Sequence, residues 1–210
     1  MKLYTFDAAP NPARLKMFIE YKGITVDTEQ IDIGQGAQRS SSYTDIVPEA
    51  TLPALVIDKH TRLTEVIAIA HFLEAEFPQR PLLGTTPLER AQVLNWNHRL
   101  FNTLFMACAE AFRNSHPAFA GRGLPGPLDV EQIPALAERG KLRLDAGLQL
   151  MERELAGRPF VAGSNFSFAD IDLLAVLGFA KWAAKTEPSD DMQYLLAWQQ
   201  RAMEALASPG

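Results

Sequence analysis

The side chains that could do chemistry lie at the ends of short elements in the first third of the chain. Ala8-Ala9-Pro10-Asn11 separates an apolar run from a helical pattern, Leu52-Pro53 opens a second apolar run, and Glu65 opens a second helical pattern. Two helix N-termini and one strand edge can meet at a single small anionic ligand, because backbone N–H groups and the helix dipole favour negative charge. If the Leu52-Pro53 bond is cis, Leu52 can turn its backbone N–H and C=O outward to pair with an extended ligand. This set predicts a site for a small peptide.

The other reactive side chains form no comparable set. The four histidines are scattered, and none lies at a metal-ligand spacing from a carboxylate or from the single cysteine, so we expect no metal; they are His60, His71, His98 and His116. Gly34-x-Gly36 follows a strand pattern, but Arg39 stands where a dinucleotide fingerprint has its third glycine, which indicates a loop. Cys108 lies on an apolar helical stretch, so its thiol is expected to be buried rather than reactive.

The elements that must position these residues alternate between strands and helices up to about residue 77. Strand patterns cover Lys2–Phe6, Val26–Ile33, Leu52–Ile57 and Arg62–Thr64. Pro12 suits the first position of a helix with Asn11 as its N-cap, and Gly23 is placed to end that helix. A second helix is expected from Glu65, with its apolar side running to Phe77. The order βαβ and then ββα predicts a small mixed sheet covered by helices.

The composition changes between Pro78 and Pro87, a stretch that holds three prolines and one glycine. Beyond it the pattern is helical; helices are expected at 88–113, 134–155, from Ser167 onward, and at about 190–207. Ser167 and Asp170 form a Ser-x-x-Asp relative of the capping box, which makes Ser167 the predicted N-cap. The sequence therefore predicts an α/β domain over 1–78, a linker over 79–87 and an all-α domain over 88–210.

Composition excludes several other classes of protein. Lys and Arg number 20 against 25 Asp and Glu, and the net charge of -5 comes without a basic stripe, so we expect no nucleic-acid partner. The first residues meet an acid and two prolines before any apolar run of signal-peptide length. The apolar stretch Leu173 to Ala180 is far shorter than the roughly 20 residues that span a bilayer. With one cysteine and no disulfide, the expected location is the cytoplasm, with no membrane attachment.

Over essentially its whole length the chain resembles the cytosolic glutathione transferases. The resemblance rests on pieces in the same order: Lys2-Leu3-Tyr4, Ala8-Ala9-Pro10-Asn11, Lys22-Gly23-Ile24, Leu52-Pro53-Ala54-Leu55, Leu63-Thr64-Glu65, Ala68-Ile69, Phe72-Leu73-Glu74, Pro81-Leu82-Leu83-Gly84, Gly157 to Gly163, and Ser167-Phe168-Ala169-Asp170-Ile171. It implies a thioredoxin-like N-terminal domain that binds glutathione, a helical domain that shapes the pocket for a second substrate, and a homodimeric detoxification enzyme.

Residue by residue, the resemblance assigns the glutathione site. Leu52 would pair its backbone with the cysteinyl unit, Pro53 would be the cis proline, and Glu65 would receive the γ-glutamyl group. Val66 stands where the family usually has serine, so a hydroxyl donor is lost there; at ~1.5–3 kcal/mol for a hydrogen bond to a charged group, glutathione would bind about tenfold more weakly. Arg39 and Thr51 stand near positions that contact the glycyl end or the backbone of glutathione in relatives.

The family's serine hydroxyl, which many bacterial relatives direct at the glutathione sulfur, is also missing because this position is Ala9. Asn11 is the remaining polar candidate, as in the nu-like bacterial classes, where an asparagine one residue beyond this proline lies near the sulfur. Its amide can donate to a thiolate, whereas the competing interpretation is that Asn11 only caps its own helix. Tyr4 resembles the N-terminal tyrosine of some classes, but its place inside a strand favours a core or interface role.

The second-substrate pocket is expected on the first helix of the second domain, at Phe105, Met106, Phe112 and Arg113. An apolar wall suits hydrophobic electrophiles, whereas Arg113 or His116 would steer an anionic one; the aromatic residues fit a plain core role equally well. The function predicted by the resemblance is conjugation of the glutathione thiolate to a small electrophile. Two alternatives remain open: a glutathione-dependent disulfide reductase or peroxidase, and a non-catalytic binding protein of the same fold.

Overall fold

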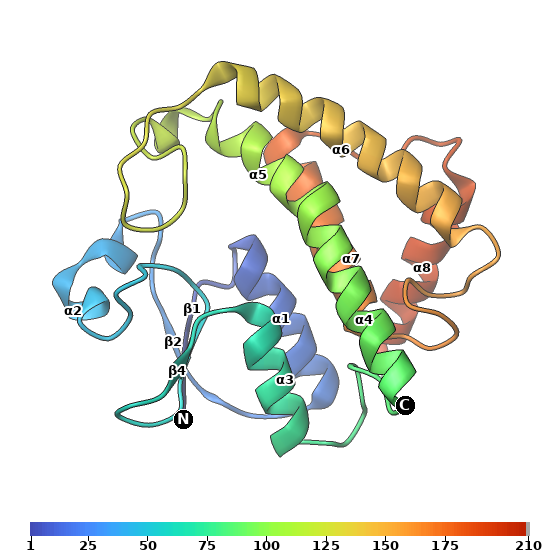
Figure 1. The fold of residues 1–210 in the computed structure, drawn as a ribbon, viewed down its shortest axis with the longest axis horizontal. Helices are drawn as coiled ribbons and strands as arrows, with labels where there is room; N and C mark the ends of the chain where they lie inside the picture. The colour runs from blue at the N-terminus through green and yellow to red at the C-terminus, as the bar shows by residue number, and fades with distance from the viewer. Residues whose placement is uncertain (209–210) are drawn as a thin grey trace. The chain divides into compact units, whose positions relative to one another are not determined.

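A computed structural model describes residues 1–208, which divide into two compact units (Figure 1). Unit 1 comprises Met1–Arg80 together with Leu124–Asp129, and unit 2 comprises Pro81–Gly123 and the chain from Val130 onward. Strands lie in unit 1, and the long helices of unit 2 follow one another without a sheet between them. An α/β unit followed by an all-α unit is the predicted fold class.

Unit 1 is built on a four-stranded sheet in the order β2-β1-β3-β4. The strands are β1 (Lys2–Thr5), β2 (Asp27–Gln30), β3 (Ala54–Val56) and β4 (Arg62–Leu63). β2 runs parallel to β1, whereas β1 with β3 and β3 with β4 are antiparallel. Leu3 lies opposite Leu55, and Leu55 lies opposite Leu63. The predicted mixed sheet is confirmed, although β2 is shorter than expected and its four residues are exposed at an edge of the sheet.

Two helices, α1 (Pro10–Lys22) and α3 (Val66–Glu76), lie side by side in unit 1 (Figure 1). Their apolar residues Leu15, Phe18, Ile69 and Leu73 are fully buried, which accounts for the helical spacing in the sequence. A second apolar cluster forms around the ring of Tyr43, in the short segment made by η1 (Ala37–Arg39) and α2 (Ser41–Thr44).

The start of α1 corrects a prediction. The helix begins at Pro10 with Ala9 as its N-cap, so Asn11 is the second helical residue and does not cap the helix. Pro10 and Pro12 both fit because the first-turn positions have no intrahelical acceptor for an N–H, and proline lacks that N–H. Gly23 ends the helix in the left-handed conformation at φ 65°, as predicted.

The end of α1 is fixed by a buried ammonium group. The Lys22 Nζ lies 2.6 Å from Glu74 Oε2 on α3 and donates to the carbonyl oxygen of Gln79 at 2.7 Å. The side chain of Lys22 has no exposed surface, so its charge depends on these acceptors. This contact joins the two helices of unit 1 to the chain that leaves α3.

Within the described residues, unit 2 contains one long helical rod, three further α-helices and a short 3-10 helix. Its elements are α4 (Pro87–Leu100), η2 (Phe101–Phe105), α5 (Met106–Arg113), η3 (Pro117–Phe119), α6 (Pro134–Leu155), α7 (Phe168–Phe179), η4 (Ala180–Ala184) and α8 (Gln193–Ala207). The helix predicted over 88–113 is continuous in space, but a π-helical turn at η2 joins α4 to α5 (Figure 1). A second π-helical turn, η4, ends α7, and α8 begins three residues later than predicted.

Close helix packing and one buried carboxylate organise the core of unit 2. A Cβ atom at Gly140 would lie 2.6 Å from the Ala107 carbonyl oxygen, so glycine allows α6 to approach α5. Asp170 accepts hydrogen bonds from the backbone and hydroxyl of Ser167, from the Val161 N–H and from the Trp198 indole N–H, at 2.8 to 3.0 Å. Ser167 is the N-cap of α7, as the Ser-x-x-Asp pattern predicted.

Within residues 1–208, no helix combines the length and apolar character needed to cross a bilayer.

Candidate functional site

The register of the sheet brings the predicted glutathione residues to one end of unit 1. Tyr4 lies opposite Ala54, so the chain that enters β3 at Leu52 and Pro53 lies beside the chain that leaves β1 toward α1. Leu63 lies opposite Leu55, so the chain that leaves β4 toward Glu65 points to the same end. The two helix N-termini and the entry to β3 therefore lie toward the same end of the sheet.

The first turn of α1 offers an unusual set of donors. The Ala9 N–H donates to the Phe6 carbonyl at 2.8 Å, and the Ala13 N–H donates to the Ala9 carbonyl at 2.9 Å. Pro10 and Pro12 have no N–H. Among residues 1–208 the Asn11 N–H meets no acceptor, which makes it the one free backbone donor of this turn. Ala9, which replaces the expected serine, contributes no hydroxyl.

The side chain of Asn11 is held at one end. Arg14 Nη1 donates to Asn11 Oδ1 at 2.9 Å, whereas Asn11 Nδ2 has no partner within the described chain. Sequence reasoning missed Arg14, and the available signal was its position three residues after Asn11, on the same side of the helix.

At the entry to β3 one residue has an unpaired backbone within the described part of the chain. The Leu52-Pro53 bond is cis, as expected, and no hydrogen bond within residues 1–208 uses the backbone N–H or C=O of Leu52. The preceding residue, Thr51, is held in place by a hydrogen bond, because the Tyr43 hydroxyl donates to the Thr51 carbonyl at 2.7 Å. Burial raises the pKa of Tyr43, so its phenol remains protonated and can keep donating.

At the start of α3 the two predicted residues differ in environment. Glu65 is the N-cap, with an extended backbone and an exposed carboxylate that makes no cap hydrogen bond. Val66 is 4% exposed, so its isopropyl group packs inward and only its backbone N–H remains for a ligand at this helix N-terminus. An exposed carboxylate beside a helix N-terminus can receive an ammonium and a carboxylate group from one ligand.

Two further residues of unit 1 that the sequence singled out differ in burial, since Arg39 is exposed and Tyr4 is buried. The Arg39 Nη2 lies 2.8 Å from Asp129 Oδ1, in the segment Leu124–Asp129 that belongs to the same unit. Tyr4 is buried in the second apolar cluster, with its ring 5.9 Å from that of Tyr43 in an edge-on arrangement. Its burial agrees with the core interpretation.

The residues predicted to line the second-substrate pocket lie around the junction of η2 and α5 in unit 2. Phe105 and Phe112 belong to the buried core, where both rings contact Phe179, whereas Met106 and Arg113 are half-buried. The Phe112 ring also lies 4.9 Å from the ring of Trp182, which is 58% exposed. An aromatic surface therefore continues from the core to solvent.

Charge next to this aromatic surface comes from two arginines. The Arg113 guanidinium lies 4.4 Å from the centre of the Phe119 ring, and the Arg122 guanidinium lies 5.8 Å from the same ring. Burial, with a smaller contribution from Arg122, lowers the pKa of Arg113 to about 10, which leaves it charged at neutral pH. Cys108 is fully buried, and burial raises the pKa of its thiol to about 12, so it is not a nucleophile at neutral pH.

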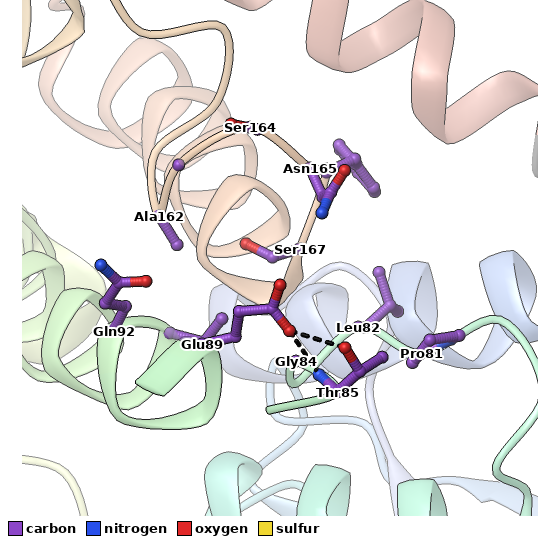
Figure 2. A pocket seen from close by; sticks show the side chains of 13 residues that line it. Pro81, Leu82, Gly84, Thr85, Glu89, Gln92, Ala162, Ser164, Asn165 and Ser167 are labelled. Carbon is purple, nitrogen blue, oxygen red and sulfur yellow. Dashed lines mark hydrogen bonds between the residues drawn. The ribbon is translucent and has the colours of Figure 1, made fainter. Parts of the chain in front are cut away.

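A cavity of about 370 Å³ lies elsewhere in unit 2, and it contains none of the predicted site residues (Figure 2). It lies between the start of α4 and the loop before α7, and its lining includes Gln92, Ser164 and Asn165. Glu89 reaches back into the loop before α4, where Oε2 accepts from the Thr85 N–H at 2.8 Å and from its hydroxyl at 2.7 Å. These bonds show that Glu89 has a structural role, as a capping residue of α4.

Comparison with known proteins agrees with this architecture. The sequence profiles described as "Glutathione S-transferase, N-terminal domain" and "Glutathione S-transferase, C-terminal domain" match residues 8–76 and 134–205. A solved glutathione S-transferase domain-containing protein from Marinobacter aquaeolei VT8 is 31% identical, with a TM-score of 0.83 and 96% of each chain covered. The structure of Gtt2 from Saccharomyces cerevisiae is 27% identical, with a TM-score of 0.85, and the match covers 98% of this chain and all of that one.

A curated protein of Saccharomyces cerevisiae, glutathione S-transferase 2, is 27% identical over 206 residues, which is 97% of this chain and 86% of that protein. A thioredoxin-like unit with donors at one sheet end, followed by an all-helical unit, defines a glutathione-dependent class of transferase enzymes. The chain belongs to the glutathione S-transferase family, and the predicted fold is confirmed.

Proposed function

We propose that this glutathione S-transferase binds reduced glutathione across the sheet end of unit 1 and conjugates it to small electrophiles. Leu52 pairs its free backbone N–H and C=O with the cysteinyl unit, as an added strand does. The γ-glutamyl end meets the exposed Glu65 carboxylate with its ammonium group and the Val66 N–H with its carboxylate. Arg39 and Thr51 lie toward the glycyl end, and Pro53 shapes the turn beside Leu52.

The observation that carries the proposal is the pair of free donors on Asn11. Its backbone N–H and its Nδ2 lack partners within the described chain, and both lie on the first turn of α1. A helix N-terminus and hydrogen-bond donors lower the pKa of a thiol from about 8.5, so more of it is ionised at neutral pH. The thiolate then forms a bond to an electrophilic carbon, and the electron pair of the broken bond leaves with the leaving group.

The electrophile meets residues of unit 2. Phe105, Met106 and Phe112 supply an apolar and aromatic wall, which suits hydrophobic compounds, and Arg113 adds a positive charge for those that carry a negative group. We propose further that the enzyme is a cytoplasmic homodimer, and that 1–78, 79–87 and 88–210 act as glutathione domain, linker and second-substrate domain.

Calorimetric titration with reduced glutathione, and in parallel with glutathione disulfide, tests the ligand. Saturable binding of reduced glutathione is expected. Tighter binding of the disulfide would favour a reductase or peroxidase instead. Absence of binding by either at millimolar concentration would favour a non-catalytic binding protein, an interpretation motivated by Ala9 and the inward-packed Val66.

The variant Asn11→Ala tests the chemistry. Loss of a hydrogen bond to a charged group corresponds to ~1.5–3 kcal/mol, so kcat/KM toward a reactive aryl halide should fall about 10- to 100-fold at neutral pH. Asn165→Ala, at an exposed asparagine of unit 2, is the matched control and should leave the rate unchanged. An unchanged rate in Asn11→Ala would remove Asn11 from the mechanism.

A further inference from the structure

We infer that Arg14 is a positioning residue that fixes the orientation of the Asn11 amide, so that Nδ2 and not Oδ1 faces the glutathione sulfur. The inference rests on the proposed function, because it concerns how the site directs its donors at the thiolate. Its starting point is the 2.9 Å contact between Arg14 Nη1 and Asn11 Oδ1.

The chemistry of the two side chains permits one orientation. A guanidinium has five N–H donors and no acceptor, so the asparagine atom that faces it must be the oxygen. Rotation of the amide by half a turn would place two N–H donors against the guanidinium and leave Oδ1 facing the ligand. An oxygen lone pair repels a thiolate, whereas an N–H stabilises it. Arg14 therefore decides whether Asn11 helps or opposes ionisation.

Burial gives this contact its rigidity. Arg14 is 5% exposed, so water has little access to its guanidinium and does not readily replace the hydrogen bond to Asn11. Asn11 and Arg14 are three residues apart on the first turns of α1, which keeps their side chains on one side of the helix.

The backbone makes the orientation decisive. Pro10 and Pro12 remove two of the donors that a helix N-terminus ordinarily presents, and only the Asn11 N–H remains free within residues 1–208. A second donor for the sulfur must come from a side chain, and Ala9 has none to give. The Asn11 amide, when Nδ2 faces the ligand, is therefore one of the two free donor groups of this turn within residues 1–208.

The test is a double-mutant cycle on the pKa of the bound glutathione thiol, followed by the ultraviolet absorbance of the thiolate. Asn11→Ala should raise this pKa by about one unit. Arg14→Met, which removes the donor, should raise it by a similar amount, and the double variant should show no further rise. Arg14→Gln keeps an uncharged N–H donor and should restore part of the shift.

The outcomes separate the inference from the proposed function. If Asn11→Ala raises the pKa and Arg14→Met does not, the inference fails alone. Fully additive shifts would show that Arg14 acts on the thiolate by its charge, which also overturns it. If Asn11→Ala leaves the pKa unchanged, or the wild-type protein does not bind glutathione, both fail.

A measurement on the wild-type protein covers the case in which Arg14→Met does not fold. With ¹⁵N label, the Asn11 Nδ2 resonance should move as the bound thiol titrates, with an inflection at the thiol pKa. A resonance that does not follow this titration would overturn the orientation. Circular dichroism and the Kd for glutathione of each variant show whether it is folded.

Discussion

Single side chains set the strength of the candidate glutathione site. Asn11 concentrates the free donors of α1 at one residue because the prolines on either side have no N–H. Val66 acts in the opposite direction, since an isopropyl group occupies the place of a hydroxyl and is packed inward. We therefore expect the site to stabilise the glutathione thiolate by hydrogen bonds and to bind the γ-glutamyl group more weakly.

The substitution Val66→Ser should strengthen glutathione binding. A hydroxyl at the start of α3 adds one donor to the γ-glutamyl carboxylate, and ~1.4 kcal/mol corresponds to a Kd about tenfold lower. Calorimetry on the folded protein measures this change.

The matched control for this substitution is Val66→Ala, which removes the same packing without adding a donor. Both variants should lose stability, by ~1–2 kcal/mol, because a buried aliphatic side chain is shortened. If alanine tightens binding as much as serine, extra space rather than the hydroxyl is responsible.

The places of the candidate site residues in the fold were more predictable than their hydrogen bonds. Leu52-Pro53 and Glu65 were found because proline and helix-start signals are local in sequence, and the sheet register then brings them to one end of unit 1. Arg14 was missed because helix periodicity shows which side a residue lies on and not which atom it donates to.

At the scale of elements, capping hydrogen bonds fix the residue at which a helix begins. At α4 the predicted linker ends in a capping box, in which the Glu89 N–H donates to Thr86 Oγ1 at 3.2 Å and the Thr86 N–H donates to Glu89 Oε2 at 3.0 Å. Hydrogen bonds from the Thr85 hydroxyl and from the backbone N–H groups of Thr85 and Thr86 lower the pKa of Glu89 to about 2.

This pKa predicts an acid-dependent contribution to stability. Because the folded pKa is lower than the value of 4.5 for a free glutamate, the carboxylate stabilises the folded chain above about pH 4.5 and loses that effect as the pH falls toward 2. The wild-type protein should exceed Glu89→Gln in its urea midpoint at pH 6, and the difference should shrink progressively below pH 4.5.

Circular dichroism of the helices follows this unfolding. Glu76→Gln, which removes an exposed carboxylate at the end of α3, is the control for the change in net charge. A gap between wild type and Glu89→Gln that stays constant down to pH 3 would contradict the capping role.

Across the whole molecule, the order of elements followed from periodicity and from Gly and Pro signals. Pro134 opens and Leu155 closes α6 as predicted, because a proline start and a 22-residue amphipathic pattern leave little choice. The start of α1 was placed two residues late, since two prolines in one turn offer two equally good first positions. The π-helical turns at η2 and η4 had no signal, because they depend on how the helices pack.

A homodimer is the oligomeric state we expect for the whole molecule. Gel filtration with light scattering should give a mass near twice the chain mass of 23.2 kDa at micromolar concentration. On α4 the apolar side chains of Leu88 and Leu94 are exposed, and a second copy of the chain could cover them in a dimer. A mass of one chain that persists at high concentration would rule out the dimer.

The π-helical turn Phe101–Phe105 has a consequence for the comparison of relatives. A π turn holds one residue more than an α turn over nearly the same rise, which is the signature of a single-residue insertion in a regular helix. In a regular α-helix one inserted residue would shift the facing of all later residues by about 100°, whereas the π turn takes up the extra residue, so the later residues keep their faces. A relative whose helix is regular here should align with Cys108 to Arg113 only after a one-residue gap, and an ungapped alignment would assign these positions to the wrong face.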